Sequence, residues 1–189
     1  AANKAAMNVS YGTITNNGTV TVDDGVGIYG TNGSKLENTS AGTINVTNSG
    51  YGIVGMATGS SVQAYGKDAG AAGKAVEIIN DGTINIAGEG AMGMYLDEGA
   101  EGHNYGTIKT VPNATNDGIK GVVALNGAII KNYGTIDIKD GTNLTGVYLA
   151  KGEYDKSSTG TVTGGINEKQ QSDTGKKVAG IEIKAPGNG

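Results

Sequence analysis

One short element, Gly-Thr-Ile or Gly-Thr-Val, recurs along the 189-residue chain and constrains its fold more than any other feature. The six clear copies begin at Gly18, Gly42, Gly82, Gly106, Gly134 and Gly160. Repeats of about 20 to 50 residues are typical of solenoids, in which each repeat buries its apolar face only against its neighbours. A further copy, Gly12-Thr13-Ile14-Thr15, lies shortly before the first and has no clear place in this spacing.

Two other apolar elements accompany these copies. The element that follows each copy reads Gly27-Ile28-Tyr29, Gly52-Ile53-Val54, Gly93-Met94-Tyr95-Leu96, Gly121-Val122-Val123, Gly146-Val147-Tyr148-Leu149 and Gly180-Ile181-Glu182-Ile183. A weaker element precedes several copies, at Leu36-Glu37-Asn38, Ile78-Ile79-Asn80 and Ile130-Lys131-Asn132. Three short segments per repeat, each bounded by Gly or Asn, predict three strands in every coil.

Aliphatic and polar residues alternate within these segments, as the two-residue period of a strand requires. Ile84 and Ile86 are therefore expected to point inward, while Thr83 and Asn85 face solvent. The chain has 35 Gly and no Phe, Trp or Cys, so small aliphatic side chains must build its core, which suits a thin stacked structure. The sequence predicts an all-β fold, a right-handed parallel β-helix with three short strands per coil and about six to seven coils. We expect residues 1–189 to form a single segment of a longer β-helix.

An asparagine stands two residues before the Gly of several copies, at Asn16, Asn80, Asn104 and Asn132. Asn tolerates left-handed backbone angles and bonds to neighbouring main chain, so it suits a sharp corner. Stacked coils would align these side chains into a ladder of amide hydrogen bonds. Ordinary turn chemistry without a ladder is the alternative.

The longest departure from the repeat is residues 57–75, which we expect to form a protruding loop rich in Ala, Gly and Ser. Tyr65, Lys67 and Asp68 lie near its middle. Shorter excursions are expected at residues 111–120 and 164–177. Insertions of this kind often carry the binding function of solenoids, so this loop is a candidate binding site.

A second candidate binding site is the outward position of the element that follows each Gly-Thr-Ile copy. This position holds Tyr29, Val54, Tyr95, Val123, Tyr148 and Glu182. Exposed tyrosines offer a rigid apolar face with a polar tip, which suits contacts with proteins or sugars. The alternative is that these residues only stabilise adjacent strands through cross-strand contacts.

The sequence offers little for catalysis. His103 is the only histidine and is expected to be a turn or strand residue, because no nucleophile motif accompanies it. The enzymatic alternative is a β-helical polysaccharide-cleaving enzyme with paired carboxylates, for which Asp24 and Asp97 would have to meet across stacked corners. The acidic pairs Asp23-Asp24 and Asp97-Glu98 are more simply solvated turn residues than calcium ligands. We predict no catalytic residues, no metal and no cofactor.

The charge of the chain bears on its partners. All 14 basic residues are Lys and the formal net charge is −4, which argues against nucleic-acid binding, because base and phosphate recognition rely heavily on Arg. No apolar run is long enough for a transmembrane helix, and residues 1–10 do not resemble a signal peptide, so we expect no membrane insertion by this segment.

Gly-Thr-Ile coils preceded by Asn-Asp or Asn-Tyr, together with Gly-Ile-Tyr strands, resemble the passenger domains of monomeric bacterial type V autotransporters. The composition, which is rich in Asn, Lys, Ile and Gly and lacks Arg, is most similar to that of the large fusobacterial autotransporter adhesins. The resemblance covers nearly the whole chain and implies export across the outer membrane to the bacterial cell surface. It also implies adhesion to a protein or glycan of host cells or other bacteria, with adjoining coils of the parent passenger as further partners. No functional residue is implied by it.

Overall fold

The computed structural model describes residues 5–57 and 74–169, which form short strands joined by turns and loops. The strands belong to three sheets, which we name A, B and C. Sheet A contains β1 (Ala5–Ser10), β4 (Val26–Thr31), β7 (Tyr51–Met56), β10 (Met92–Leu96), β13 (Lys120–Leu125), β16 (Thr145–Ala150) and β19 (Ile166–Lys169). Sheet B contains β2 (Thr13–Asn16), β5 (Lys35–Asn38), β8 (Glu77–Asn80), β11 (Glu101–Asn104), β14 (Ile129–Asn132) and β17 (Glu153–Tyr154). Sheet C contains β3 (Thr19–Asp23), β6 (Thr43–Thr47), β9 (Thr83–Ala87), β12 (Thr107–Thr110), β15 (Thr135–Asp137) and β18 (Thr161–Thr163).

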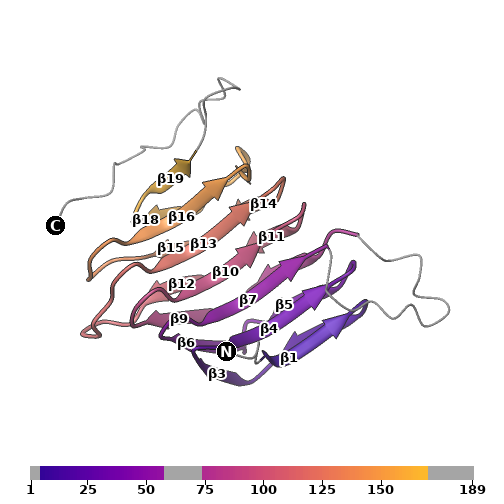
Figure 1. Ribbon diagram of the computed structural model, residues 1–189, viewed down its shortest axis with the longest axis horizontal. Coiled ribbons are helices and arrows are strands. Elements are labelled where there is room, and N and C mark those ends of the chain that lie inside the picture. The colour runs from indigo at the N-terminus through magenta and orange to yellow at the C-terminus, as the bar shows by residue number, and fades with distance from the viewer. Residues whose placement is uncertain (1–4, 58–73, 170–189) are drawn as a thin grey trace.

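After β1, every coil visits the sheets in the same order: first sheet B, then sheet C, then sheet A. Each strand pairs in parallel with the equivalent strand of the neighbouring coil. Equivalent strands therefore rise in steps from the indigo end of the chain to the yellow end (Figure 1). The predicted parallel β-helix with three short strands per coil is confirmed.

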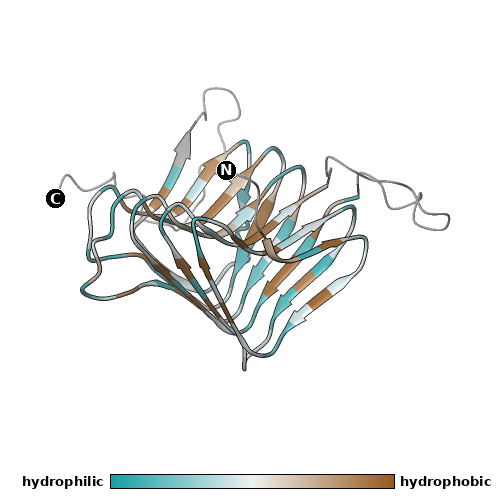
Figure 2. Ribbon diagram, turned by 60° about the horizontal axis from the view of Figure 1, so that its bottom comes forward, coloured by the Kyte–Doolittle hydropathy of each residue, from teal (hydrophilic) through white to brown (hydrophobic). Residues whose placement is uncertain are grey.

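The interior of the coils is a stack of aliphatic side chains. On sheet C, Ile44, Ile84, Ile108 and Ile136 align in one row, and all four are fully buried. The inward row of sheet A contains Ile28, Ile53, Met94, Val122 and Val147. Hydrophobic residues alternate with hydrophilic ones along the strands (Figure 2). Removing these rows from water supplies the main favourable term of folding.

The glycine of the Gly-Thr-Ile element is required by close contact between coils. A Cβ atom on Gly82, Gly106 or Gly134 would lie 2.1 to 2.3 Å from the carbonyl oxygen of the glycine one coil earlier. None of these three glycines has a positive φ. Their role is therefore to let two backbones approach each other at the corner between sheets B and C, and a turn with left-handed angles is not involved.

The structure places the extra copy at Gly12-Thr13-Ile14-Thr15. Its residues form β2, which pairs with β5 and starts sheet B. It is thus equivalent to the weaker element that precedes Gly-Thr-Ile, although its sequence resembles the Gly-Thr-Ile element itself. The two elements are similar because both place Thr outward and Ile inward on a strand.

The expected excursion at residues 164–177 is wrong over its first part. Ile166–Lys169 form β19, which pairs with β16 and provides the last described strand of sheet A. Gly164 and Gly165, both with positive φ, make the sharp turn that leads into this strand. The element that the sequence predicts for this place, Gly180-Ile181-Glu182-Ile183, lies outside the described residues.

Only the ends of the 57–75 segment belong to the described residues, and Tyr65, Lys67 and Asp68 lie outside them. The carbonyl oxygens of Ala57 and Lys74 accept hydrogen bonds from the consecutive backbone N–H groups of Asn32 and Gly33, at 3.2 and 2.9 Å. The chain therefore leaves the shaft and rejoins it at one corner, between β7 and β8.

Candidate functional site

The four predicted corner asparagines lie in one buried row, joined by a fifth, Asn38. The side-chain amide of each donates a 2.8 Å hydrogen bond to the side-chain oxygen of the next, in the order Asn16, Asn38, Asn80, Asn104 and Asn132. The sequence pattern missed Asn38 because three residues, rather than one, separate it from the glycine of its copy. The row is a structural ladder, since buried amides are stable only when their hydrogen bonds are satisfied.

The ladder ends on a tyrosine. In the next coil β17 carries Tyr154 at the position where β14 carries Ile130, and this side chain is buried. The amide of Asn132 donates to the Tyr154 hydroxyl at 3.3 Å and to the carbonyl oxygen of Thr161 at 3.1 Å. In the described part of the chain no buried side-chain polar atom lacks a partner. The buried polar groups of the described coils are therefore saturated by contacts within the chain.

Tyr29, Tyr95 and Tyr148 lie in one outward row on sheet A, where they alternate with Val54 and Val123. The two valines are only 6% and 3% exposed, although they face outward, and each has a tyrosine on both neighbouring strands. Burial raises the pKa of the Tyr29 and Tyr95 hydroxyls, with a smaller contribution from nearby acidic side chains. The row thus shields the strands beneath it.

Each of these tyrosines has its own surroundings. The ring of Tyr95 meets that of Tyr51 edge to face, with centroids 5.6 Å apart. The ammonium of Lys120 lies 5.8 Å from the ring centroid of Tyr148. Because the three tyrosines are two strands apart, or about 9.5 Å, they do not merge into one aromatic surface. Binding by this row stays a prediction.

A second, more exposed set of side chains runs along the outer face of sheet B to the corner where it meets sheet C. It consists of Glu101 and His103 on β11, Lys131 on β14, and Tyr105 and Tyr133, which directly follow these two strands. We call these five residues the corner cluster. The register pairs His103 with Lys131 and Asn104 with Asn132, so the two coils present equivalent positions side by side. The buried asparagines between the outward residues anchor this part of the shaft.

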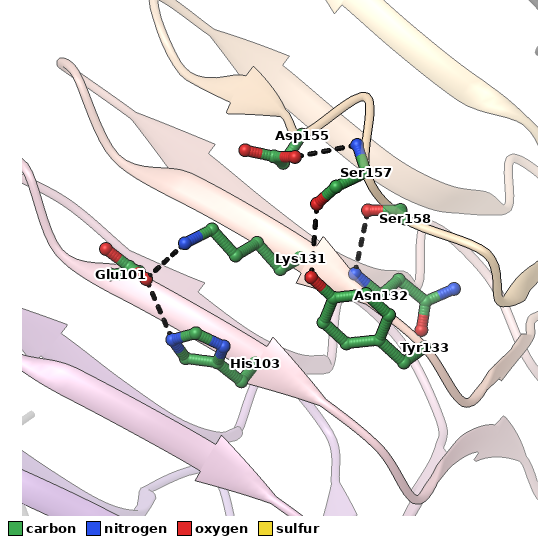
Figure 3. A network of polar contacts seen from close by, with 8 residues as sticks. All are labelled: Glu101, His103, Lys131, Asn132, Tyr133, Asp155, Ser157 and Ser158. Carbon is green, nitrogen blue, oxygen red and sulfur yellow. Dashed lines mark hydrogen bonds and ion pairs between the residues drawn. The ribbon is translucent and has the colours of Figure 1, made fainter.

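The charged half of the corner cluster centres on one carboxylate oxygen. Glu101 Oε1 lies 2.6 Å from Lys131 Nζ and 2.9 Å from His103 Nε2 (Figure 3). The hydrogen bond from Lys131, followed by the charges of Lys131 and His103, lowers the pKa of Glu101. The same hydrogen bond raises the pKa of Lys131. Glu101 and Lys131 are thus held as an ion pair across two coils.

The aromatic half consists of two exposed rings. Tyr105 is 52% exposed and Tyr133 is 37% exposed. Their planes are 17° from parallel and their centroids lie 5.3 Å apart, and the His103 ring is nearly parallel to that of Tyr105 at 6.2 Å. Rings in full face contact are closer than this, so the pair is offset and part of each face remains open.

The next coil supports the cluster from one side. Ser157 Oγ lies 3.1 Å from the Tyr133 hydroxyl, and the Ser157 backbone N–H donates to Asp155 at 2.7 Å (Figure 3). The hydrogen bonds from Ser157 lower the pKa of Asp155. Ser158 Oγ accepts from the backbone N–H of Asn132 at 2.9 Å. These contacts hold Tyr133 in place, whereas Tyr105 carries more open surface.

Sequence reasoning missed every member of the corner cluster except His103, which it treated as a structural residue. A usable signal existed: Asn-Tyr-Gly-Thr-Ile occurs twice, at residues 104–108 and 132–136. Identical pentapeptides in consecutive coils put both tyrosines at the same corner. Strand β11 itself was overlooked because Gly102 occupies the inward position that holds Ile or Leu in most other coils.

The carboxylates proposed for the enzymatic alternative do not meet. Asp24 precedes β4, whereas Asp97 follows β10, so in a parallel sheet they lie at opposite ends of sheet A. A strand of this length spans about 17–20 Å, far beyond the separation of a glycosidase pair. Among residues 5–57 and 74–169, no three His, Cys, Asp or Glu side chains group as metal ligands.

Comparison with known proteins yields no relative. No protein-family model, no curated protein and no solved structure matches this chain. Within the described ranges, the chain forms no helix with the length and apolar character that crossing a bilayer requires.

Proposed function

We propose that this chain is a structural and adhesive segment of a cell-surface autotransporter passenger, exported across the outer membrane. It attaches the bacterium to host cells or to other bacteria through its lateral faces or loops. The observation that carries the proposal is the corner cluster, an exposed aromatic and charged set on a shaft whose described core is buried and hydrogen-bonded. Exposed aromatic side chains with hydrogen-bonding neighbours are characteristic of contact surfaces.

The division between interior and exterior supports this function. The coil repeat accounts for the inward rows of Ile, Val and Asn, which build the shaft. The outward positions vary from coil to coil, and there the tyrosines of sheet A and the corner cluster are found. A solenoid offers long lateral faces of this kind, which suit attachment to extended surfaces.

An attachment assay tests the proposal. Beads coated with the purified chain are incubated with cultured epithelial cells and with bacteria of other species, and bound beads are counted. We expect saturable attachment that the soluble chain competes away. Beads coated with heat-unfolded chain serve as the control. Attachment no greater than that of the control beads on any cell type would show the proposal to be wrong.

The contribution of sheet A is measured with a matched pair of variants. In the first, Tyr29, Tyr95 and Tyr148 are replaced by Thr, a residue that favours strands. In the second, the outward residues Asn45, Asn85 and Lys109 of sheet C are replaced by Thr. Loss of attachment only in the first variant assigns binding to the tyrosine row. Equal attachment of both variants removes that row from the adhesive surface.

A further inference from the structure

The corner cluster combines an apolar platform and a fixed polar group within two adjacent coils. The platform is the offset pair of Tyr105 and Tyr133 rings. The polar group is the Glu101 carboxylate, which is held by Lys131 and His103. From this combination we propose that the corner cluster binds a neutral pyranose residue of a surface glycan. This inference rests on the proposed adhesive function and names its ligand class.

The rings suit the face of a sugar. One side of many pyranose rings presents several C–H groups and no hydroxyl, and this side is apolar. Such a face packs on an exposed aromatic ring, where the partly positive hydrogens meet the negative ring face. Tyr105 and Tyr133 expose 52% and 37% of their surface, and their offset leaves open ring area over two coils.

The charged side chains suit the rim of the same sugar. Glu101 Oε1 already accepts from Lys131 and His103, which fixes the orientation of the carboxylate. A fixed ionised carboxylate is a strong acceptor for sugar hydroxyls, and Lys131 adds donors beside it. Preorganised groups of this kind lose little entropy when a ligand binds.

Two further hydroxyl groups lie on the sheet C side of the corner. Thr107 and Thr135 follow the two tyrosines by two residues and are paired in register at the start of β12 and β15. They alternate with the fully buried Ile108 and Ile136, so their side chains face outward. A glycan that extends from the rings toward sheet C would therefore meet further hydrogen-bonding groups, as a polyhydroxylated ligand requires.

The charge of the cluster favours a neutral ligand over a cationic peptide. A Lys or Arg side chain would also pack on a tyrosine face, but it would want an unpaired carboxylate beside the ring. The Glu101 carboxylate is engaged by Lys131 at 2.6 Å, and that ammonium would repel an incoming cation. A neutral sugar meets no such repulsion.

The proposal is tested with the whole chain on an array of neutral and charged oligosaccharides. Hits are followed by titration with the free oligosaccharide and by saturation-transfer NMR. We expect at least one neutral glycan to bind, with transfer to the C–H face of one pyranose. Tyr105→Ser should weaken binding at least tenfold, Glu101→Gln should weaken it severalfold, and Tyr105→Phe should keep most of it because the ring remains.

A matched control lies elsewhere on the chain. Tyr11 is 48% exposed, close to the exposure of Tyr105, and has a φ of 58°, which Asn tolerates. Tyr11→Asn should bind the glycan as the parent does. Circular dichroism and thermal melting of every variant check that the fold is intact, and Tyr105→Phe keeps the test valid if Tyr105→Ser fails to fold.

Three outcomes would overturn the inference. They are absence of any bound neutral glycan, undiminished glycan binding by Tyr105→Ser, and binding of lysine-rich peptides in place of sugars. Bead attachment separates this failure from that of the adhesive function. If Tyr105→Ser beads still attach to cells as the parent does, the adhesive function stands and only its assignment to this cluster falls.

Discussion

Leu96 fills the space that a side chain on Gly102 would need: a Cβ atom there would lie 2.6 Å from Leu96 Cδ2. Leu96 is the last residue of β10 and Gly102 is the second residue of β11, on opposite sides of the corner between sheets A and B. Two coils earlier the large and small residues are exchanged: Gly30 stands at the position of Leu96, and Leu36 stands at that of Gly102. A Cβ atom on Gly30 would lie 2.7 Å from Leu36 Cδ2. Each of these corners therefore holds one large and one small inward residue, as close packing requires.

This complementarity predicts a measurable coupling. Gly102→Leu should destabilise the chain by about 1–3 kcal/mol through overpacking. Leu96→Ala should cost about 2–5 kcal/mol through the cavity it leaves. In the double variant the new side chain enters that cavity, so its loss in the free energy of unfolding should be smaller than the sum by about 0.5–3 kcal/mol. Urea denaturation of all four proteins measures this, and strict additivity would contradict the packing described.

The glycines of the Gly-Thr-Ile element differ in how much space surrounds them. A Cβ atom on Gly106 would lie 2.1 Å from the carbonyl oxygen of Gly82, whereas one on Gly18 would meet nothing within 4 Å. Gly106→Ala should therefore lower the free energy of unfolding by about 1–3 kcal/mol. Gly18→Ala is the matched control and should change it by less than about 0.5 kcal/mol. Similar melting temperatures for both variants would refute the backbone-contact explanation.

The asparagine ladder should be most sensitive in its middle. Asn80→Ala removes the acceptor of one Asn38 N–H and the donor to the Asn104 side-chain oxygen, so two buried groups each lose a hydrogen bond. Each such group costs about 1–3 kcal/mol. Asn16→Ala, at the end of the ladder, breaks only its bond to Asn38 and local contacts with Gly18, so we expect a smaller loss. Hydrogen exchange of the corner amides compares the two, and equal losses would show that the ladder is not cooperative.

Acid should weaken the corner cluster through Glu101. Its pKa in the folded chain is lowered from the ordinary value of 4.5, mainly by the hydrogen bond from Lys131. A lowered folded pKa means that the ion pair stabilises the fold above pH 4.5 and that this contribution is lost as the pH falls through the folded value. The contribution is small because the Glu101 side chain is 41% exposed.

The check uses Glu101→Gln and Lys131→Met. The difference in melting temperature between the parent and Glu101→Gln should shrink as the pH is lowered from 7 to about 3. In Lys131→Met, the NMR titration of the Glu101 carboxyl carbon should move to a higher pKa. An unchanged Glu101 titration in that variant would show that Lys131 is not the main cause of the shift.

The sequence by itself determined the shaft. Alternation such as Thr83-Ile84-Asn85-Ile86 specifies which residues face the core, because a strand has a period of two. Recurrence of that alternation with Gly between the copies excludes a helix and requires stacking. Even the asparagine row was visible, since four of its five members hold the same place before a glycine. These features are local or strictly repeated, and local patterns can be read along the chain.

Only the tertiary structure decided which outward residues meet. The ion pair of Glu101 with Lys131 joins residues 30 positions apart, and its existence depends on the register of β11 against β14. Because the loops differ in length from coil to coil, the number of residues between two side chains does not show whether they face each other on neighbouring strands. Asp24 and Asp97 lie at opposite ends of sheet A because Asp24 follows a strand of sheet C and Asp97 follows a strand of sheet A. The repeat fixes the interior because every coil must fill the same space, whereas the surface is free to vary and its contacts arise only when the coils are stacked.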